Sequence, residues 1–266
     1  MTEALDITSP GNPRLKALTG LHRRRSRREA GVTVVEGHDE LSLALEAGAV
    51  PTTLFTCPDL VTPERAGLVE QVQATGAEVL RLGRAAFERI SYRDSPDGLL
   101  AVLPDPARAL AALQLPTDPL LLVAEGIEKP GNLGAMLRTA EAAGVDAVVA
   151  ASPLTDWANP NVVRASKGTL FAVPVADAPA AEVVAWLRRR QVRLVVATPE
   201  ADALVTEVDL TGPVAIAVGT EHEGVTEGLR DAADQLVRLP MAGRVNSLNV
   251  ATAAAVCVYE AVRQRG

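Results

Sequence analysis

Aromatic residues and cysteines are scarce in this sequence of 266 residues. Aromatic side chains make up 3% of the chain, with two Trp, two Tyr and three Phe. This scarcity argues against an extended aromatic platform of the kind that stacks unpaired nucleobases. The two cysteines, Cys57 and Cys257, lie far apart, and no second cysteine or histidine stands at metal-ligand spacing from either. Neither a disulfide framework nor a metal site is therefore expected.

Long apolar runs are also lacking. No run approaches the roughly 20 residues that span a bilayer, and the first 16 residues contain no continuous apolar segment typical of a secretion signal. We therefore expect a cytoplasmic protein that does not enter a membrane. The composition is 48% apolar and 22% charged, and Ala, Val and Leu dominate. Such a chain can bury a substantial core of sheets covered by helices, in one large or two modest domains.

The net charge of −7 argues against a nucleic-acid partner, because phosphate neutralisation supplies most of the affinity for nucleic acids. The distribution of charge gives a different indication. Residues 1–28 contain seven Lys and Arg but only two acidic residues, which makes this segment a basic arm. The arm is either a solvated helix face or a surface that contacts phosphates.

The chain divides into two parts on its pattern of apolar segments. Residues 1–105 alternate short helical and strand-like stretches, beginning with a basic, helix-compatible stretch at 13–29, and predict a small α/β domain. Four prolines between 104 and 119 mark a linker at 106–118, with a short helix expected at 107–113. The second domain is expected at 119–266.

The second domain carries continuous apolar runs separated by helical stretches. This order predicts a parallel sheet covered by helices, with ligands at the ends of the strands. The expected strands are 120–126, 146–152, 192–199 and 213–221. The expected helices are 132–143, 160–168, 178–190 and 248–263.

The first polar loop after an expected strand contains Asn132 and Arg138. A tight turn leads there into a helix whose free backbone amides can hold an anion. Alternatively, Asn132 caps the helix and Arg138 pairs with a surface carboxylate. The glycines at 131 and 134 do not have the G-x-G-x-x-G spacing, so a conventional nicotinamide-dependent dehydrogenase or a nucleotide-dependent ligase is disfavoured.

Two further loops have the same placement. Gly219 ends a buried strand and Glu221 follows it, although an acidic residue there also suits the start of a helix. Leu239-Pro240-Met241 ends a short strand, and Ser247-Leu248-Asn249 opens a long helix with Ser247 as a credible N-cap. Each loop has a purely structural interpretation, but the combination of three does not.

Taken together, the three loops resemble the successive motifs of the SpoU/TrmH RNA methyltransferases. The matching segments are N-L-G-A-x-x-R-T-A at Asn132–Ala140, G-x-E-x-x-G-V-T at Gly219–Thr226, and L-P-M…S-L-N-V at Leu239–Val250. V-V-R-A-S-K-G-T-L-F at Val162–Phe171 is also typical of the family. The S-x-x-N-P-R-L-K opening at Ser9–Lys16 and the later V-V-E-G-H-D-E-L segment are similar to an RNA-binding substrate domain with a fold like that of a small ribosomal protein.

The resemblance implies a fold and a cofactor. It implies an α/β chain whose C-terminal methyltransferase domain has a parallel sheet tied in a trefoil knot, and which forms a homodimer. The implied cofactor is S-adenosyl-L-methionine, without a metal. Its adenosyl portion is expected to lie in the knot against six residues, namely Thr198, Gly219, Leu239, Met241, Leu248 and Val250.

The implied reaction is methylation of a ribose 2′-hydroxyl of RNA, with 23S ribosomal RNA as the expected substrate. Arg138 is either the general base or, because a guanidinium stays protonated, a group that binds the adjoining phosphate and stabilises developing negative charge. The expected positioning residues are Asn132, Glu221, Ser247 and Asn249. The expected phosphate contacts in the basic arm are Arg14, Arg23, Arg24 and Arg27.

Two alternatives remain at this stage. Transfer RNA is a second possible substrate, although the separate N-terminal domain favours ribosomal RNA. A non-catalytic RNA-binding or ribosome-assembly protein could retain the fold, but such a scaffold would not need all four of Asn132, Arg138, Glu221 and Asn249. The resemblance also extends to antibiotic-resistance methyltransferases of actinomycetes, which the motifs do not separate from housekeeping enzymes.

Overall fold

The computed structural model describes residues 5–7, 11–220, 224–244 and 247–266. They form two compact units that are described separately below. The first comprises the described residues of Met1–Pro106 together with Trp157–Ala172. The second comprises those of Ala107–Asp156 and Val173–Gly266. The sequence alone had assigned the segment 157–172 to the C-terminal domain, whereas its contacts are with the N-terminal unit.

In the described part of the first unit, five strands form a mixed sheet in the order β1-β4-β3-β5-β2. Its strands are β1 Leu5–Ile7, β2 Val32–Glu36, β3 Thr53–Thr56, β4 Glu78–Leu82 and β5 Leu99–Pro104. Its helices are α1 Pro13–Gly20, α2 Arg24–Ala30, α3 His38–Glu46, α4 Pro63–Ala74, α5 Arg84–Ile90 and α7 Pro160–Ser166, with a 3-10 turn at Thr169–Phe171. The basic stretch expected as one helix at 13–29 is thus two helices.

The segment 157–172 completes the core of the first unit. Helix α7 packs on strand β2, and the Thr33 hydroxyl donates a hydrogen bond of 2.9 Å to the carbonyl of Ala158. Gly168 has a φ of +88°, and a Cβ there would lie 2.9 Å from the carbonyl oxygen of Glu40. Only glycine fits this close approach without strain.

The second unit has a wholly parallel sheet. Its described strands pair in the order β12-β10-β11-β7-β8-β9-β6. They are β6 Ala107–Arg108, β7 Leu120–Glu125, β8 Ala147–Ala151, β9 Val175–Ala178, β10 Arg193–Ala197, β11 Val214–Val218 and β12 Gln235–Val237. The helices are α6 Pro130–Ala143, α8 Ala180–Arg189, α9 Glu227–Asp231 and α10 Val250–Arg265, with 3-10 turns at Leu110–Ala112 and Val205–Glu207. The predicted α/β fold with a parallel sheet is confirmed.

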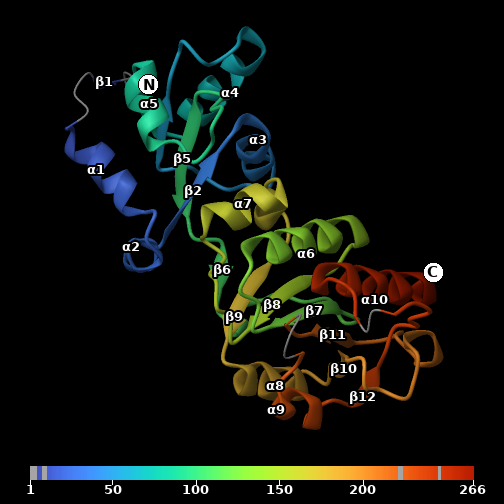
Figure 1. Ribbon diagram of the computed structural model, residues 1–266. Helices are drawn as coiled ribbons and strands as arrows, with labels where there is room; N and C mark the ends of the chain where they lie inside the picture. Colours follow the sequence, from blue (N-terminus) through green and yellow to red (C-terminus); the bar gives the residue numbers. More distant parts are fainter. Residues whose placement is uncertain (1–4, 8–10, 221–223, 245–246) are drawn as a thin grey trace. The chain divides into compact units, whose positions relative to one another are not determined.

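Helices cover both faces of this sheet, with α6 and α10 on one face and α8 and α9 on the other (Figure 1). The central strands are therefore buried throughout, as their continuous apolar runs indicate. One face contributes Leu121 and Val123 to a core that also contains Trp186 of α8.

The short helix expected at 107–113 is wrong. Ala107 and Arg108 form an edge strand paired with Val175 and Ala176, and only a single 3-10 turn follows. Pairing with a free sheet edge has outweighed the helix propensity of the Ala/Leu segment. In the ranges the structure describes, no helix is both long and apolar enough to cross a membrane.

Candidate functional site

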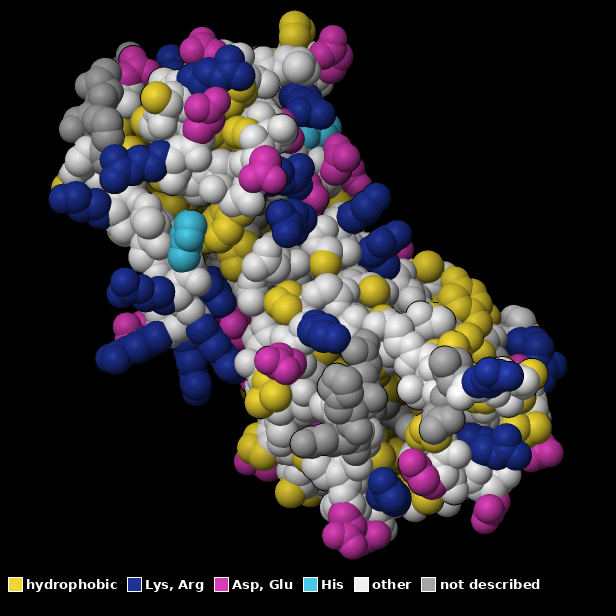
Figure 2. All heavy atoms as spheres, in the orientation of Figure 1, with side chains coloured by type: hydrophobic (Ala, Val, Ile, Leu, Met, Phe, Trp, Pro, Cys, Tyr) yellow, Lys and Arg dark blue, Asp and Glu magenta, His cyan; other side chains and the backbone are white. Residues whose placement is uncertain are grey.

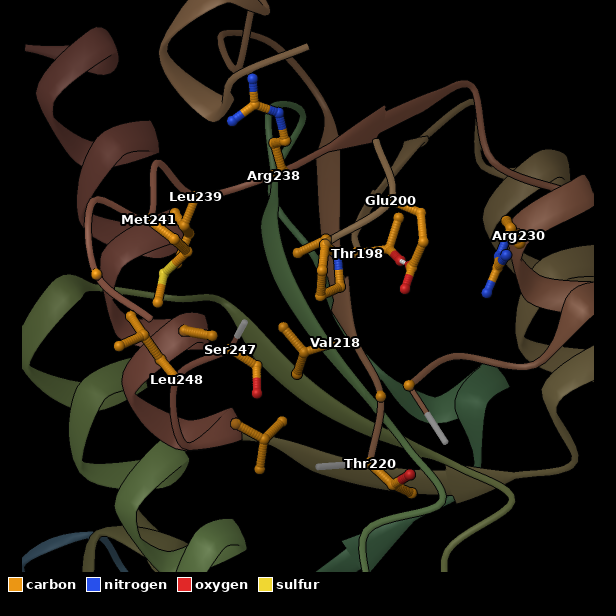
Figure 3. Close-up of a pocket in the computed structure, with 17 residues that line it drawn as sticks. Thr198, Glu200, Val218, Thr220, Arg230, Arg238, Leu239, Met241, Ser247 and Leu248 are labelled. Atoms are coloured by element: carbon orange, nitrogen blue, oxygen red, sulfur yellow. Dashed lines mark hydrogen bonds between the residues drawn. The ribbon is translucent and has the colours of Figure 1, made fainter. Parts of the chain in front are cut away.

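A cavity of about 610 Å³ lies in the second unit, where three neighbouring parallel strands end (Figure 3). Strands β10, β11 and β12 are parallel neighbours, so their carboxyl ends meet at one edge of the sheet. Thr198, Thr220 and Leu239 follow these strands and line the cavity. All six residues expected to contact the cofactor line it: Thr198, Gly219, Leu239, Met241, Leu248 and Val250. Ser247 also lines it.

One wall of the cavity is apolar. Val218 from the end of β11, Leu239 and Met241 from the segment after β12, and Leu248 from the segment before α10 point into it (Figure 3). Val250, the first residue of α10, is 5% exposed and adds to the same lining. A wall of this kind suits a flat heterocycle, because ligand sites are mostly apolar with a few placed polar groups.

Gly219 sits where the chain turns back on itself beside the cavity. A Cβ at this position would lie 2.1 Å from the carbonyl oxygen of Gly224, which is backbone and cannot move aside cheaply. The two strands of the turn are joined by reciprocal hydrogen bonds between Thr220 and Gly224, of 2.8 and 3.1 Å. The missing side chain therefore allows both the turn and a close approach to the backbone.

A carboxylate and an arginine line the polar part of the cavity. The hydroxyl of the buried Thr198 donates to Glu200, and this bond together with a backbone hydrogen bond holds the pKa of Glu200 below its usual range. Arg230 also lines the cavity, and its Nε is buried with no hydrogen-bond partner among the described residues. Arg238, directly after β12, also lines the cavity. Sequence reasoning missed Glu200, Arg230 and Arg238. The position of Glu200 directly after an apolar run was a usable signal for it.

Asn132 and Asn249 meet beside the cavity. The side-chain nitrogen of Asn249 donates a hydrogen bond of 3.1 Å to the side-chain oxygen of Asn132. Asn249 is also the N-cap of α10, accepting from the backbone N–H groups of Ala251 and Thr252. Ser247, expected as the cap, lies two residues earlier and lines the cavity instead. Asn132 lies within the first turn of α6, whose N-cap is Lys129.

Arg138 is exposed on α6 and is not part of the cavity lining. Within one chain, the structure therefore brings Asn132, Ser247 and Asn249 to the cavity or its rim but leaves Arg138 outside. Glu221 lies outside the described residues.

A buried carboxylate forms hydrogen bonds with the last residue of the motif Gly219–Thr226. Glu125, at the end of β7, is 2% exposed and accepts hydrogen bonds from both the backbone N–H and the hydroxyl of Thr226, each 2.7 Å long. Thr226 is in turn the N-cap of α9. Glu125 thereby ties the loop that carries Gly219 to the neighbouring strand. Sequence reasoning assigned this residue no role.

The basic arm belongs to the first unit, where Lys and Arg side chains gather over α2 (Figure 2). Arg23 and Arg24 are exposed, and Arg14 forms a 2.8 Å ion pair with Glu78. Arg27 is only 3% exposed, and its Nη1 donates to the carbonyls of Leu21 and His22. Because the Arg27 guanidinium donates to backbone carbonyls of its own unit, its role is structural.

The cavity lining fits S-adenosylmethionine on chemical grounds. Its apolar wall suits an adenine ring, Glu200 can accept hydrogen bonds from sugar hydroxyls, and the orphaned Nε of Arg230 can donate to a carboxylate. Across the described ranges, no cluster of three His, Cys, Asp or Glu side chains is arranged to hold a metal ion.

Comparison with known proteins identifies two matching families. Residues 119–259 match the SpoU rRNA Methylase family, and residues 12–101 match the MRM3-like substrate binding domain. The chain is 40% identical over 149 residues to the 23S rRNA (guanosine-2'-O-)-methyltransferase RlmB of Pectobacterium atrosepticum. That match covers 56% of this chain and 61% of the relative.

Two longer matches include the N-terminal unit. The chain is 32% identical over 257 residues to a 23S rRNA (uridine(2479)-2'-O)-methyltransferase of Streptomyces viridochromogenes, covering 94% of this chain and 88% of the relative. The crystal structure of an AdoMet-bound rRNA methyltransferase from Sinorhizobium meliloti matches with a TM-score of 0.90 at 28% identity, over 98% of both chains. The resemblance inferred from the three motifs is confirmed.

Proposed function

The chain belongs to the SpoU rRNA methylase family, and from this premise we propose that it methylates a ribose 2′-hydroxyl of 23S ribosomal RNA, using S-adenosylmethionine. The observation that carries the proposal is the single cavity lined by all six expected cofactor residues. The relatives named as 23S rRNA methyltransferases and the AdoMet-bound structural neighbour support the substrate and the cofactor.

S-adenosylmethionine, when bound, supplies an electrophilic methyl group on a sulfonium. The protein must then orient the ribose and stabilise the charge that develops on the attacking oxygen, while the hydroxyl proton passes to solvent and S-adenosylhomocysteine is the leaving group. We assign the orienting role to the Asn132–Asn249 pair at the rim of the cavity. The guanidinium of Arg138 binds the adjoining phosphate and offsets the developing alkoxide charge. Glu221 and Ser247 remain proposed positioning residues.

The exposed position of Arg138 outside the cavity favours a role for it in a second subunit. We propose a homodimer in which Arg138 of one chain serves the cofactor cavity of the other. Val256 and Tyr259 of α10, 44% and 49% exposed, support such a contact because large apolar side chains on a surface mark interfaces. Sedimentation analysis of the purified protein tests the dimer directly.

Mixed dimers test whether Arg138 acts across subunits. Gly219→Val destroys the cavity and Arg138→Ala removes the guanidinium, so each homodimer is expected to be inactive. In a dimer of the two variants, one site combines an intact cavity with an intact Arg138. Random mixing makes half of the dimers mixed, so about a quarter of the wild-type activity returns. A mixture that stays inactive places Arg138 in its own chain's site.

A match over 94% of this chain, which includes the N-terminal unit, to a 23S rRNA methyltransferase supports ribosomal RNA over transfer RNA. Arg14, Arg23 and Arg24 contact phosphates in this proposal, and Arg27 holds the arm together.

We further propose that the two domains divide at the linker 106–118, which includes β6. From family membership, we propose that the C-terminal domain is tied in a trefoil knot. We also propose a cytoplasmic location, where ribosomal RNA is found. An electron-density trace of residues 214–266 tests the knot.

Methyl transfer from radiolabelled cofactor tests the activity. Unmodified 23S rRNA and a transfer RNA pool are incubated with wild-type protein and with Gly219→Val as the inactive control. We expect label in 23S rRNA alone, at one ribose that resists alkaline cleavage. Label only in transfer RNA contradicts the substrate. Cofactor binding without transfer to either RNA favours a non-catalytic assembly protein.

A further inference from the structure

An aromatic pair with one exposed ring lies at the base of the basic arm. The rings of His22 and Tyr92 stack with their centroids 4.2 Å apart and their planes 29° from parallel. His22 is exposed, in the connection between α1 and α2, whereas Tyr92 is half-buried after α5. Tyr92 therefore backs one face of the imidazole and leaves the rest of the ring open to solvent. The chain has only two tyrosines, and one of them, Tyr92, forms this stack with His22.

A buried cation fixes the backbone at His22. Arg27 is 3% exposed, and its Nη1 donates to the carbonyls of Leu21 and His22, at 2.9 and 3.0 Å. Burial of a guanidinium is costly unless its donors are satisfied. Here the satisfied donors hold in place the residue that carries the outer ring of the stack.

A buried anion fixes Tyr92 in the same way. Glu36 is 7% exposed and accepts a 2.7 Å hydrogen bond from the backbone N–H of Tyr92, together with one from the hydroxyl of Ser91. Burial raises the pKa of Tyr92 to about 12, so its phenol stays neutral. The buried side chains of Arg27 and Glu36 therefore hold the backbone of the two stacked residues in place. A solvent-exposed histidine without a binding role would not need its position fixed in this way.

The surroundings of the stack are strongly basic. Arg23, Arg24, Arg25 and Arg28 are all exposed on the segment that begins directly after His22. Lys and Arg side chains gather over this part of the first unit (Figure 2). Burial and the neighbouring Arg27 lower the pKa of His22, which keeps its ring neutral at physiological pH. Arg25 pairs with Glu29 at 2.7 Å, on the same exposed helix. A flat neutral ring beside exposed arginines matches the composition of single-stranded RNA sites, where bases stack and arginines follow the backbone.

We propose that the open face of His22 stacks an unpaired nucleobase of the RNA, with Tyr92 as the backing ring and the α2 arginines on the flanking phosphates. The inference rests on the proposed RNA substrate and adds a base-stacking site in the first unit. It requires only one anchored pair and is compatible with the low aromatic content of the chain.

Substitutions that separate stacking from packing test the proposal. His22→Ala removes the ring, His22→Leu keeps an apolar cover over Tyr92, and His22→Phe keeps a flat ring. Affinity is measured on transcribed 23S rRNA by filter binding. We expect Ala and Leu to weaken binding by roughly 5- to 150-fold and Phe to stay near wild type, since base–aromatic stacking supplies that range. Equal affinities for Leu and Phe, or wild-type affinity for Ala, overturn the proposal.

The salt dependence of binding and a fluorescent base give independent readouts. His22→Ala should leave the slope of log affinity against log salt unchanged, whereas Arg24→Gln should reduce it by about one. A short single-stranded RNA with one 2-aminopurine should lose fluorescence on wild-type protein but not on His22→Ala. His38→Ala, a second histidine of the first unit, is the matched control. Unquenched fluorescence with the wild type contradicts the stacking site.

The failure of this inference is distinguishable from failure of the methyltransferase assignment. If wild-type protein methylates 23S rRNA but His22→Ala binds it equally well, only the stacking site is wrong. If binding depends on the ring at position 22 but no RNA is methylated, the stacking site stands and the activity fails. Affinity for S-adenosylhomocysteine, measured by calorimetry, should be the same in the wild type and in the three His22 variants.

Discussion

The side chain of Asn249 performs two tasks at once. Its oxygen caps α10 by accepting from the backbone N–H groups of Ala251 and Thr252, while its nitrogen donates to Asn132 at 3.1 Å. Two segments that are 117 residues apart in sequence are thereby joined at the rim of the cavity. The cap fixes the start of α10, and Val250 immediately after it lines the cavity.

Asn249→Ser separates the two tasks. Serine caps helices about as well as asparagine, but its hydroxyl is too short to reach Asn132. We expect the free energy of unfolding to change by less than about 0.5 kcal/mol, while methyl transfer falls roughly 100-fold through misplacement of the reacting groups. Asn249→Ala should also lose about 1 kcal/mol of stability. Urea unfolding and single-turnover transfer measure the two effects.

The cap of α7 gives the control for this prediction. Asn159 also accepts a backbone hydrogen bond, from Asn161, but lies in the first unit. Asn159→Ser should leave transfer unchanged. Full activity in Asn249→Ser would mean that the bond to Asn132 has no part in catalysis.

Glu200 is expected to accept hydrogen bonds from the ribose hydroxyls of the cofactor. Thr198 orients its carboxylate and keeps the pKa of Glu200 low, so the acceptor is ionised at neutral pH. Glu200→Gln should weaken S-adenosylhomocysteine binding about 10-fold, since hydrogen bonds to charged groups contribute roughly 1.5–3 kcal/mol. Calorimetry on the purified protein measures this, with Glu182→Gln on α8 as the matched control.

A deoxy ligand identifies the group that Glu200 binds. Removal of one ribose hydroxyl from S-adenosylhomocysteine should weaken binding to wild-type protein but have little further effect on Glu200→Gln. Equal losses in both proteins would show that the two groups are independent, and Glu200 would then have another partner.

The sequence predicted the second unit well because its strands are strong local signals. The continuous apolar runs at 120–126 and 213–221 are strands Leu120–Glu125 and Val214–Val218 in the structure. Since parallel strands end at one edge, the loops after them converge. Five residues chosen from two motifs therefore line one cavity together with Thr198. The apolar pattern of the strands and their parallel arrangement together explain why the strands of the second unit could be predicted.

What the sequence could not supply depends on tertiary contacts. Helix α7 has an ordinary helical pattern, and only its packing on β2 assigns it to the first unit. Ser247 and Asn249 are equally good caps by residue type. Residue type alone therefore does not decide which of the two caps the start of α10, and the structure shows that it is Asn249. Glu200 and Arg230 look like ordinary surface charges until the fold brings them to the same cavity.

Loss of the Glu125–Thr226 contact should destabilise the second unit and its cofactor site together. Glu125→Gln replaces one of the two carboxylate oxygens with an amide nitrogen, which cannot accept. One of the two Thr226 donors then lacks an acceptor and is left buried and unsatisfied. We expect a loss of roughly 1–3 kcal/mol in the free energy of unfolding. Binding of S-adenosylhomocysteine should weaken as well, because the same contact holds the loop that contains Gly219.

A double-mutant cycle isolates this contact. Thr226→Ala alone removes the hydroxyl and the cap of α9. If the two side chains interact directly, the double variant should be more stable than the sum of the single losses predicts, by about 1 kcal/mol. Strict additivity in urea unfolding would show that Glu125 acts through other partners.

The pH dependence of stability should depend on Glu36. Burial raises the pKa of this carboxyl in the folded protein, and the hydrogen bonds from Ser91 and Tyr92 only partly oppose the shift. Above the raised pKa, Glu36 is ionised in both the folded and the unfolded chain, and the buried charge reduces stability. As the pH falls through the raised pKa, the folded state takes up a proton before the unfolded state does, so the folded state gains stability. The gain is complete at the ordinary pKa of glutamate.

Glu36→Gln removes this titration and keeps a side-chain acceptor for the Tyr92 N–H. The difference in unfolding free energy between wild type and variant should therefore shift in favour of wild type as the pH is lowered from 8 towards about 5. Other carboxylates titrate equally in both proteins and cancel in the difference. Urea unfolding at matched ionic strength across this range measures it. A difference that grows in favour of wild type with rising pH would mean that the hydrogen bonds from Ser91 and Tyr92 outweigh burial and lower the pKa of Glu36.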